Sequence, residues 1–228
     1  MSKKLRLPKN PVPGLSHLSF TSWWTEQGTK RYVEIVFDMH EKLFKVTLDA
    51  KVARLQNDVT DSLRELTKPD KTQVSMKLHE RMLGGASLTS LGPAKSVPHQ
   101  LPPLDEWDLH LGVRLKILGR PTTLMQADLQ TTEWLEYQST RLKIILKEYI
   151  DNLSKYETVA TDLPARMASF SASPSRGKGR TDLRATLNLI DDCHVRLSRY
   201  RPSVAQGLYA HVRQLQNVTA DPGAVLEE

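Results

Sequence analysis

Two pairs of neighbouring side chains in this sequence are of types that take part in catalysis. Cys193 and His194 are a thiol beside an imidazole, the combination that a nucleophilic site requires. Successive residues of a helix point about 100° apart, so these two side chains cannot act as a nucleophile and its base. Asp108 and His110 would share one face of a strand, but two polar residues without a third partner indicate ordinary surface polarity. Neither pair predicts a catalytic site.

A third candidate is the basic, glycine-containing segment Arg176-Gly177-Lys178-Gly179-Arg180. A phosphate-binding loop would need the spacing Gly-x-x-x-x-Gly-Lys-Ser/Thr after a buried strand, and this segment has neither. We therefore predict a flexible basic linker there. The sequence contains no EF-hand loop, no His-x-x-x-His pair and no cluster of ligating side chains. We expect no enzyme activity, no metal, no cofactor and no small-molecule substrate.

The net charge of +6 at pH 7 indicates an acidic partner. Nucleic acid, anionic lipid and the acidic surface of a microtubule all satisfy that condition. Basic side chains concentrate in an N-terminal arm and in the predicted linker, and we take them as candidate partner-binding residues. They are Lys3, Lys4, Arg6 and Lys9 in the arm, and Arg176, Lys178 and Arg180 in the linker. The alternative is that these charges only keep flexible segments soluble.

Composition also bears on the cellular compartment. The single cysteine excludes an internal disulfide and a cysteine-rich zinc site, and it is typical of a reducing compartment. No apolar run approaches the roughly 18–20 residues that span a bilayer. The basic N-terminus lacks the apolar segment of a signal peptide. We expect an intracellular protein that is not bound in a membrane.

The N-terminal half has the pattern of a small β-domain. Residues 1–17 are rich in proline and lack periodicity, which predicts an extended basic arm. Between residues 18 and 48, three β-branched and aromatic runs separated by short turns predict an antiparallel meander of three strands. Apolar residues then recur every three or four positions over residues 52–66, which predicts a helix, and a second helix is predicted over residues 72–83. These two helices place a helical insertion at about residues 50–85.

A second β segment and a long helix follow the insertion. Apolar and polar residues alternate over residues 109–117, which predicts a strand. Gly112 and Gly119 stand where the backbone must turn sharply, which glycine does at low steric cost. Asp128 is predicted to open a long helix over residues 128–156 as its N-cap.

The C-terminal part is predicted to be helical after a linker at residues 157–180. Apolar residues at alternating spacings of four and three indicate helices over residues 181–217, followed by a tail at residues 218–228. Pro202 interrupts this pattern, and Ser203 is predicted to cap a short continuation. The two seamed helices on either side of the linker suggest an antiparallel hairpin, or two arms that dock on other proteins.

Two separated segments carry the most specific signal in the chain. The first contains Trp23-Trp24-Thr25-Glu26 and Arg31-Tyr32, and the second runs from Trp107-Asp108-Leu109 to Gly119-Arg120. Together they resemble the opening and closing halves of a DM-ten domain, a small β-rich module of ciliary and flagellar doublet-microtubule proteins. The resemblance covers residues 18–135. Its domain-defining residues are Trp24, Glu26, Arg31, Tyr32, Asp108, Leu109, Gly112, Gly119, Arg120 and Asp128.

The resemblance implies a fold and a function. The expected fold class is α+β, with a small pleckstrin-homology-like antiparallel β-domain, an inserted helix and long C-terminal helices. The implied function is that of a non-catalytic structural protein of the axoneme, in the cytoskeleton of a cilium or flagellum. Its expected partners are tubulin in the doublet microtubule, on the outer or the lumenal face, and other axonemal proteins.

Other functions compete with this interpretation. One DM-ten architecture is fused to nucleoside diphosphate kinase domains, but that kinase needs Asn-x-x-His-Gly-Ser, and no histidine here precedes Gly-Ser. A basic nucleic-acid-binding adaptor could stack bases on tryptophan, yet all four tryptophans lie in apolar patterns that fit a core better. A lipid-binding adaptor would need a basic cluster at one sheet edge, for which Arg114, Lys116 and Arg120 are the candidates.

Overall fold

The computed structural model describes residue 5 and residues 7–26, 29–48, 72–78, 81–83, 86–87, 103–156 and 178–220. These residues form antiparallel sheets in the N-terminal part and long helices in the C-terminal part, so the predicted α+β class is confirmed. The chain divides into two compact units. The β unit comprises His17–Glu106 and Leu111–Asp128, and the helical unit comprises Met1–Ser16, Trp107–His110 and Leu129–Glu228.

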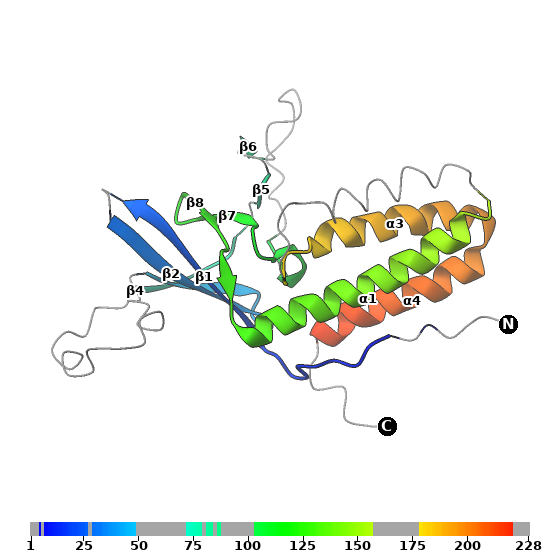
Figure 1. The fold of residues 1–228 in the computed structure, drawn as a ribbon, viewed down its shortest axis with the longest axis horizontal. Helices are drawn as coiled ribbons and strands as arrows, with labels where there is room; N and C mark the ends of the chain where they lie inside the picture. The colour runs from blue at the N-terminus through cyan, green and yellow to red at the C-terminus, as the bar shows by residue number, and fades with distance from the viewer. Residues whose placement is uncertain are drawn as a thin grey trace. The chain divides into compact units, whose positions relative to one another are not determined.

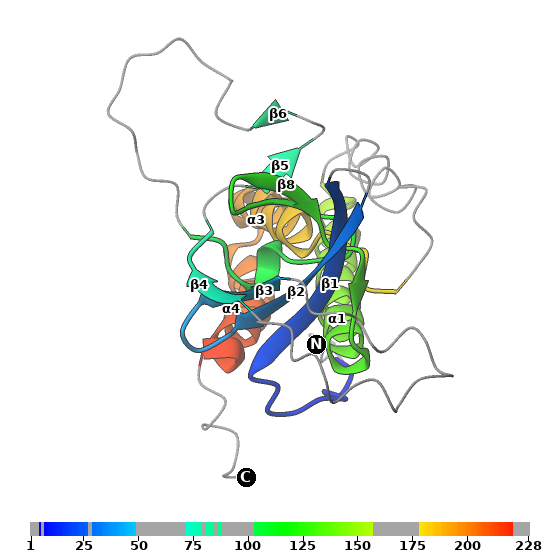
Figure 2. The ribbon, with the colours of Figure 1, turned by 90° about the vertical axis from the view of Figure 1, so that its left-hand side faces the viewer.

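The larger sheet of the β unit is built on the predicted meander. In the order β4-β3-β2-β1-β9 its strands are antiparallel, and Figure 2 shows β1, β2 and β3 side by side. The strands are β1 (His17–Glu26), β2 (Thr29–Asp38), β3 (Leu43–Leu48), β4 (Thr72–Met76) and β9 (Gln126–Ala127). Alternation buries one face, where the rings of Phe37 and Phe44 lie 4.8 Å apart across neighbouring strands. The first three strands therefore lie where the sequence predicted them.

A smaller sheet has the order β6-β5-β7-β8. Its strands are β5 (Arg81–Leu83), β6 (Ala86–Ser87), β7 (Arg114–Ile117) and β8 (Arg120–Thr123). On β7, Leu115 and Ile117 are buried while Arg114 and Lys116 are exposed. The short loop Leu118–Gly119 joins β7 to β8, with Ile117 paired opposite Arg120.

The helix predicted over residues 72–83 is wrong, because this segment contributes β4 and β5. Val74, Leu78 and Met82 are spaced as on a helix, but Val74 and Met76 also alternate as on a strand. They pair with Val46 and Phe44 of β3, and this tertiary pairing overrides the helical spacing. The other helix of the insertion, predicted over residues 52–66, lies outside the described residues.

The strand predicted over residues 109–117 is too long. The 3-10 turn η3 (Glu106–Asp108) precedes it, and the backbone turns at Gly112, where φ is 92°. The amide of Gly112 donates to the carbonyl oxygen of Leu124 at 2.8 Å, which fixes the turn. Strand pairing therefore begins only at Arg114.

Three helices make up most of the described helical unit. They are α1 (Leu129–Leu153), α3 (Leu183–Tyr200) and α4 (Pro202–Ala220), and they pack along one another (Figure 1). Asp182 caps α3, since its carboxylate accepts a hydrogen bond from the amide of Ala185 at 2.9 Å. The predicted cap at Ser203 is wrong: α4 already begins at Pro202, a residue well suited to the first helical position, and it is not short.

The three helices bury a shared apolar core. Leu142 and Ile145 of α1, Ile190 and Leu197 of α3, and Ala205 of α4 are fully buried. Cys193 is buried as well, so its thiol belongs to this packing. Along the seam predicted on α3, Leu183, Leu187, Ile190 and Leu197 are buried, His194 is half-buried, and Arg201, which follows the helix, is exposed. The helices thus bury their apolar faces against one another, as the hairpin interpretation expected.

A polar link within that core joins all three helices. The hydroxyl of the fully buried Tyr149 on α1 donates to the carbonyl oxygen of Ala205 on α4 at 2.9 Å. It also lies 3.2 Å from Nδ1 of His194 on α3. Since the hydroxyl has a single proton, Nδ1 must be the donor in the second bond. Burial raises the pKa of Tyr149 far above that of a free phenol, so the hydroxyl keeps its proton.

Replacing Tyr149 by phenylalanine is expected to lower the free energy of unfolding by about 1–2 kcal/mol, because the Nδ1 donor of His194 and one acceptor lose their buried partner. Urea unfolding followed by far-UV circular dichroism would measure it. The matched control is Tyr156→Phe, because Tyr156 stacks on Tyr200 with its ring exposed. We expect that variant to stay within about 0.5 kcal/mol of the parent protein. Equal losses in both variants would contradict a structural role for the Tyr149 hydroxyl.

Candidate functional site

The end of the β1–β2 hairpin extends beyond the rest of its sheet. Strand β3 pairs with residues 33–38 of β2, so among the described strands residues 23–26 and 29–32 form a two-stranded extension. It carries two tryptophans and a tyrosine together with two basic residues. Trp23 pairs with Tyr32, and Trp24 pairs with Arg31.

One face of this extension gathers three residues that the sequence analysis took from distant motifs. Trp24 stands opposite Arg31, and the guanidinium carbon of Arg120, on β8, lies 5.7 Å from the centroid of the Trp24 ring. Trp24 is half-buried, whereas Arg31 and Arg120 are exposed. We call Trp24, Arg31 and Arg120 the arginine–tryptophan site.

The pleat of the strands determines which residues meet there. Trp24 continues the β1 face that carries the buried Leu18, Phe20 and Ser22. Arg120 pairs with Ile117, so it continues the buried face of the β7–β8 hairpin. The hydroxyl of Ser22 donates to the carbonyl oxygen of Thr123, which holds β1 against β8. The arginine–tryptophan site therefore continues the buried faces of β1 and of the β7–β8 hairpin out to the solvent-exposed end.

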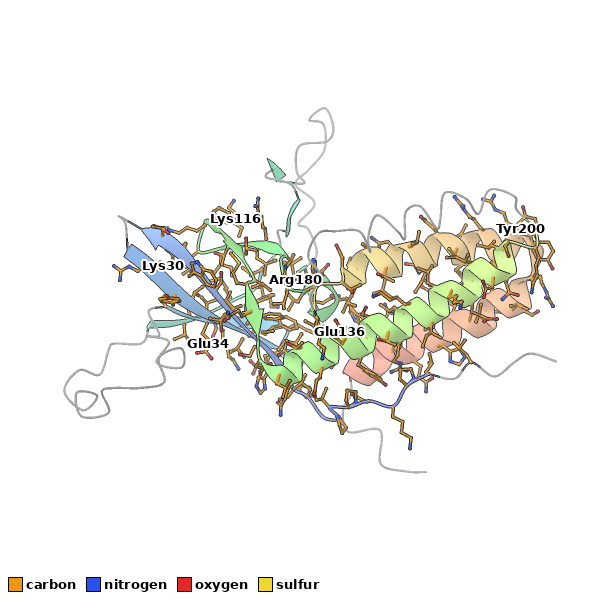
Figure 3. The ribbon with its side chains drawn as sticks, viewed as in Figure 1. Lys30, Glu34, Lys116, Glu136, Arg180 and Tyr200 are labelled. Atoms are coloured by element: carbon orange, nitrogen blue, oxygen red, sulfur yellow. The ribbon has the colours of Figure 1, made fainter. Side chains whose placement is uncertain are left out.

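The opposite face of the extension has a second aromatic group. The rings of Trp23 and Tyr32 lie 6.5 Å apart, and the ammonium of Lys30 lies 6.0 Å from the Trp23 centroid. Figure 3 labels Lys30 at this end of the hairpin and Glu34 farther along β2. Cations thus accompany the tryptophan rings on both faces of the hairpin end.

Elsewhere in the β unit, two lysines are paired with carboxylates. Lys42 lies 2.7 Å from Glu106, and Lys45 lies 3.0 Å from Asp38. Backbone hydrogen bonds at the turn, notably from Glu41, lower the pKa of Asp38, and Lys45 contributes in the same direction. These pairs balance charge at the β2–β3 turn.

The candidate lipid cluster is not a single patch. Arg114 and Lys116 project from the face of the β7–β8 hairpin opposite to the one that carries Arg120, because side chains alternate along a strand. The three residues that the sequence analysis grouped are therefore divided between two faces of the hairpin.

The chemistry that the arginine–tryptophan site offers is the binding of an oxyanion. A guanidinium presents a planar fork of N–H donors that matches a carboxylate or a phosphate, and stacking on an aromatic ring holds the fork in place. The Nε1 of Trp24 is buried, and no hydrogen-bond acceptor for it is found among the described residues. One guanidinium over the Trp24 ring, with a second arginine in the cross-strand position opposite, is an arrangement suited to an anion.

The remaining domain-defining residues have other positions. Glu26 ends β1 and Tyr32 is half-buried on β2, so the large buried area expected of Trp24 and Tyr32 is only partly present. Gly119 has a φ of 78° in the β7–β8 turn, which agrees with the predicted need for glycine. Asp128 immediately precedes α1, and its amide donates to the carbonyl oxygen of Ser19 at 3.2 Å.

Asp108 and Leu109 belong to the helical unit, where the sequence analysis did not place them. The carboxylate of Asp108 accepts two hydrogen bonds from the guanidinium of Arg184 on α3, at 3.0 and 3.1 Å. Leu109 is fully buried, and the ring of Trp107 lies 5.9 Å from that of Trp134 on α1. Asp108 and His110 therefore do not form a pair on one strand face. Arg184 was missed because nothing in the sequence links it to a residue so distant.

The candidate basic segments are only partly described. Lys9 is exposed, as are Lys178 and Arg180, while Lys3, Lys4, Arg6 and Arg176 lie outside the described residues. Described structure resumes at Lys178, within the predicted linker, and the amide of Gly179 donates to Glu136 of α1 at 2.6 Å. Figure 3 labels Glu136 and Arg180 in this region. The last residues of the predicted linker are therefore attached to α1.

Within the described residues, no group of three or more histidine, cysteine or acidic side chains gathers in a way that could hold a metal ion. The helices described there also lack the combination of length and hydrophobicity that a membrane crossing requires.

Comparison with known proteins gave no relative: no family model matches the sequence, and no curated protein is significantly similar to it. The resemblance to DM-ten domains thus depends on the residues quoted above.

Proposed function

We propose that the protein is a non-catalytic structural component of the axoneme, and that it binds the acidic surface of doublet microtubules through the arginine–tryptophan site. The observation that carries the proposal is the guanidinium of Arg120 over the Trp24 ring, with Arg31 in the cross-strand position opposite Trp24. The resemblance to DM-ten domains supports the choice of lattice. In this role the protein braces the doublet or links neighbouring axonemal proteins through distributed contacts.

The geometry favours carboxylates of a protein over the bases of a nucleic acid. A base-stacking site needs an open ring face, but a guanidinium lies over Trp24 and an ammonium over Trp23. Trp107 and Trp134 are buried, as was predicted for all four tryptophans, whereas Trp23 and Trp24 are only half-buried. What the hairpin end offers to a partner is positive charge held by aromatic rings, which suits acidic side chains.

The test is the double variant Arg31→Gln/Arg120→Gln in cosedimentation with doublet microtubules over a series of salt concentrations. We expect the affinity to fall by about 10- to 100-fold, since two charge-assisted contacts are lost. The matched control is Arg199→Gln/Arg201→Gln, which removes the same two charges from exposed positions in the helical unit. Its affinity is expected to fall by less than about threefold.

Two competitors separate the alternative partners. If RNA displaces the protein from microtubules at matched salt, the result supports nucleic-acid binding and the proposal fails. Binding to phosphatidylserine vesicles that both double variants weaken equally would indicate a diffuse electrostatic contact with lipid. An absence of the protein from salt-washed axonemes would also overturn the proposal.

A further inference from the structure

The turn between β7 and β8 has an unusual residue at its first position. Leu118 and Gly119 are the two loop residues, and both have positive φ, 50° and 78°. Two left-handed residues in a two-residue hairpin loop define a type I′ turn, whose preferred sequence is Asn-Gly or Asp-Gly. Leucine is disfavoured there because its Cβ crowds the backbone in the left-handed region.

Burial does not compensate for this strain. Leu118 is 43% exposed, so its side chain is not a core residue held in place by packing. It is flanked by Lys116, on one face of the hairpin, and by Arg120 of the arginine–tryptophan site, on the other. An apolar side chain therefore projects from a strained turn between two exposed cations.

Backbone strain without a gain in stability is a mark of a functional position. We propose that Leu118 is the apolar anchor of the partner-binding surface, and that it enters a side-chain-sized apolar depression ringed by carboxylates on an acidic protein. Arg120 and Lys116 then contact the carboxylates on either side. This inference rests on the proposed function, and it adds the shape of the surface that the partner must present.

A protein fits this anchor better than a membrane does. Even a single myristoyl chain gives only marginal membrane binding, and one leucine buries far less apolar surface. The same leucine fills a pocket of its own size in a protein, where a central apolar anchor surrounded by charges is the usual pattern of a binding hot spot.

The variant Leu118→Asn tests the inference because it should have opposite effects on stability and on binding. Asparagine tolerates the left-handed conformation, so we expect the melting temperature to rise by about 2–4 °C. The lost anchor should weaken binding to doublet microtubules by about 10-fold. Binding to poly-glutamate, which has charge but no apolar depression, should not change. The control is Leu129→Asn, which removes a leucine that is 73% exposed on α1.

The outcomes separate this inference from the proposed function. A parent protein that does not bind doublets overturns both. Doublet binding that Arg31→Gln/Arg120→Gln weakens and Leu118→Asn leaves unchanged overturns the anchor alone. A lower melting temperature in Leu118→Asn removes the argument from strain and overturns the inference. Loss of vesicle binding in Leu118→Asn, with doublet binding intact, overturns it in favour of a membrane contact.

Discussion

Replacing Trp107 by alanine is expected to lower the free energy of unfolding of the helical unit by about 3–5 kcal/mol. Trp107 is only 3% exposed, and its ring packs 5.9 Å from that of Trp134 on α1. Removing a large buried ring loses its transfer free energy and leaves a cavity that the helices fill only partly. The effect should be among the largest of any single substitution in the chain.

Denaturant unfolding followed by far-UV circular dichroism measures this loss, since most of the helical signal comes from α1, α3 and α4. Hydrogen exchange would localise it, with amides of α1 and α3 losing protection. The comparison variant is Trp23→Ala, which removes the same ring from a half-buried position on β1. A loss for Trp107→Ala no larger than that for Trp23→Ala would contradict the place of Trp107 in the helical core.

The ion pair between Asp108 and Arg184 is the second large expected effect. Asp108→Ala should lower the free energy of unfolding by about 2–3 kcal/mol, somewhat below the loss for a fully buried pair. The side chain of Asp108 is 11% exposed and that of Arg184 is 32% exposed, so the remaining guanidinium can reach water. Two hydrogen bonds join the pair, which makes it stronger than a typical surface contact.

A double-mutant cycle isolates this interaction. Asp108→Ala, Arg184→Ala and the combined variant should give a coupling free energy of about 1–3 kcal/mol. The control is Arg199→Ala, because Arg199 is an exposed arginine of the same helix, and its loss should stay within about 0.5 kcal/mol. If the losses in free energy of unfolding of the two single variants simply add in the double variant, the ion pair between Asp108 and Arg184 does not stabilise the fold.

The elements that the sequence predicts correctly are those with long, regular patterns. Apolar residues recur at every second position in β1, β2 and β3, and every three or four positions along the whole of α1. Each pattern repeats often enough to identify its element. The errors occur where a short segment satisfies two patterns. In Thr72–Met76, Val74 fits a helical spacing with later residues of the chain, but Val74 and Met76 also fit the alternation of a strand. Only the pairing with β3 selects the strand.

The sequence identified the residues of the candidate site, but it could not predict that they lie together. Trp24, Arg31 and Arg120 all belong to the motifs of the resemblance, yet their meeting depends on β8 lying against β1, which no local pattern encodes. The partners of Asp108 and Leu109 were unpredictable for the same reason. Leu118 could have been noticed, since a Leu-Gly pair between two short strands requires an unfavourable turn.

Because Trp107–His110 belongs to the helical unit, the stretch that resembles a domain is not independent of the C-terminal helices. A domain encoded as one uninterrupted stretch can be exchanged between genes, since it carries its own core with it. Here the stretch that resembles a known domain surrounds a tetrapeptide that is bonded to Arg184 of α3, a residue outside that stretch. A truncated product that stops before α3 would retain every described strand but lose the cation that holds Asp108. We expect cells to degrade such a product, so premature stop codons should behave as simple recessive losses rather than as dominant competitors.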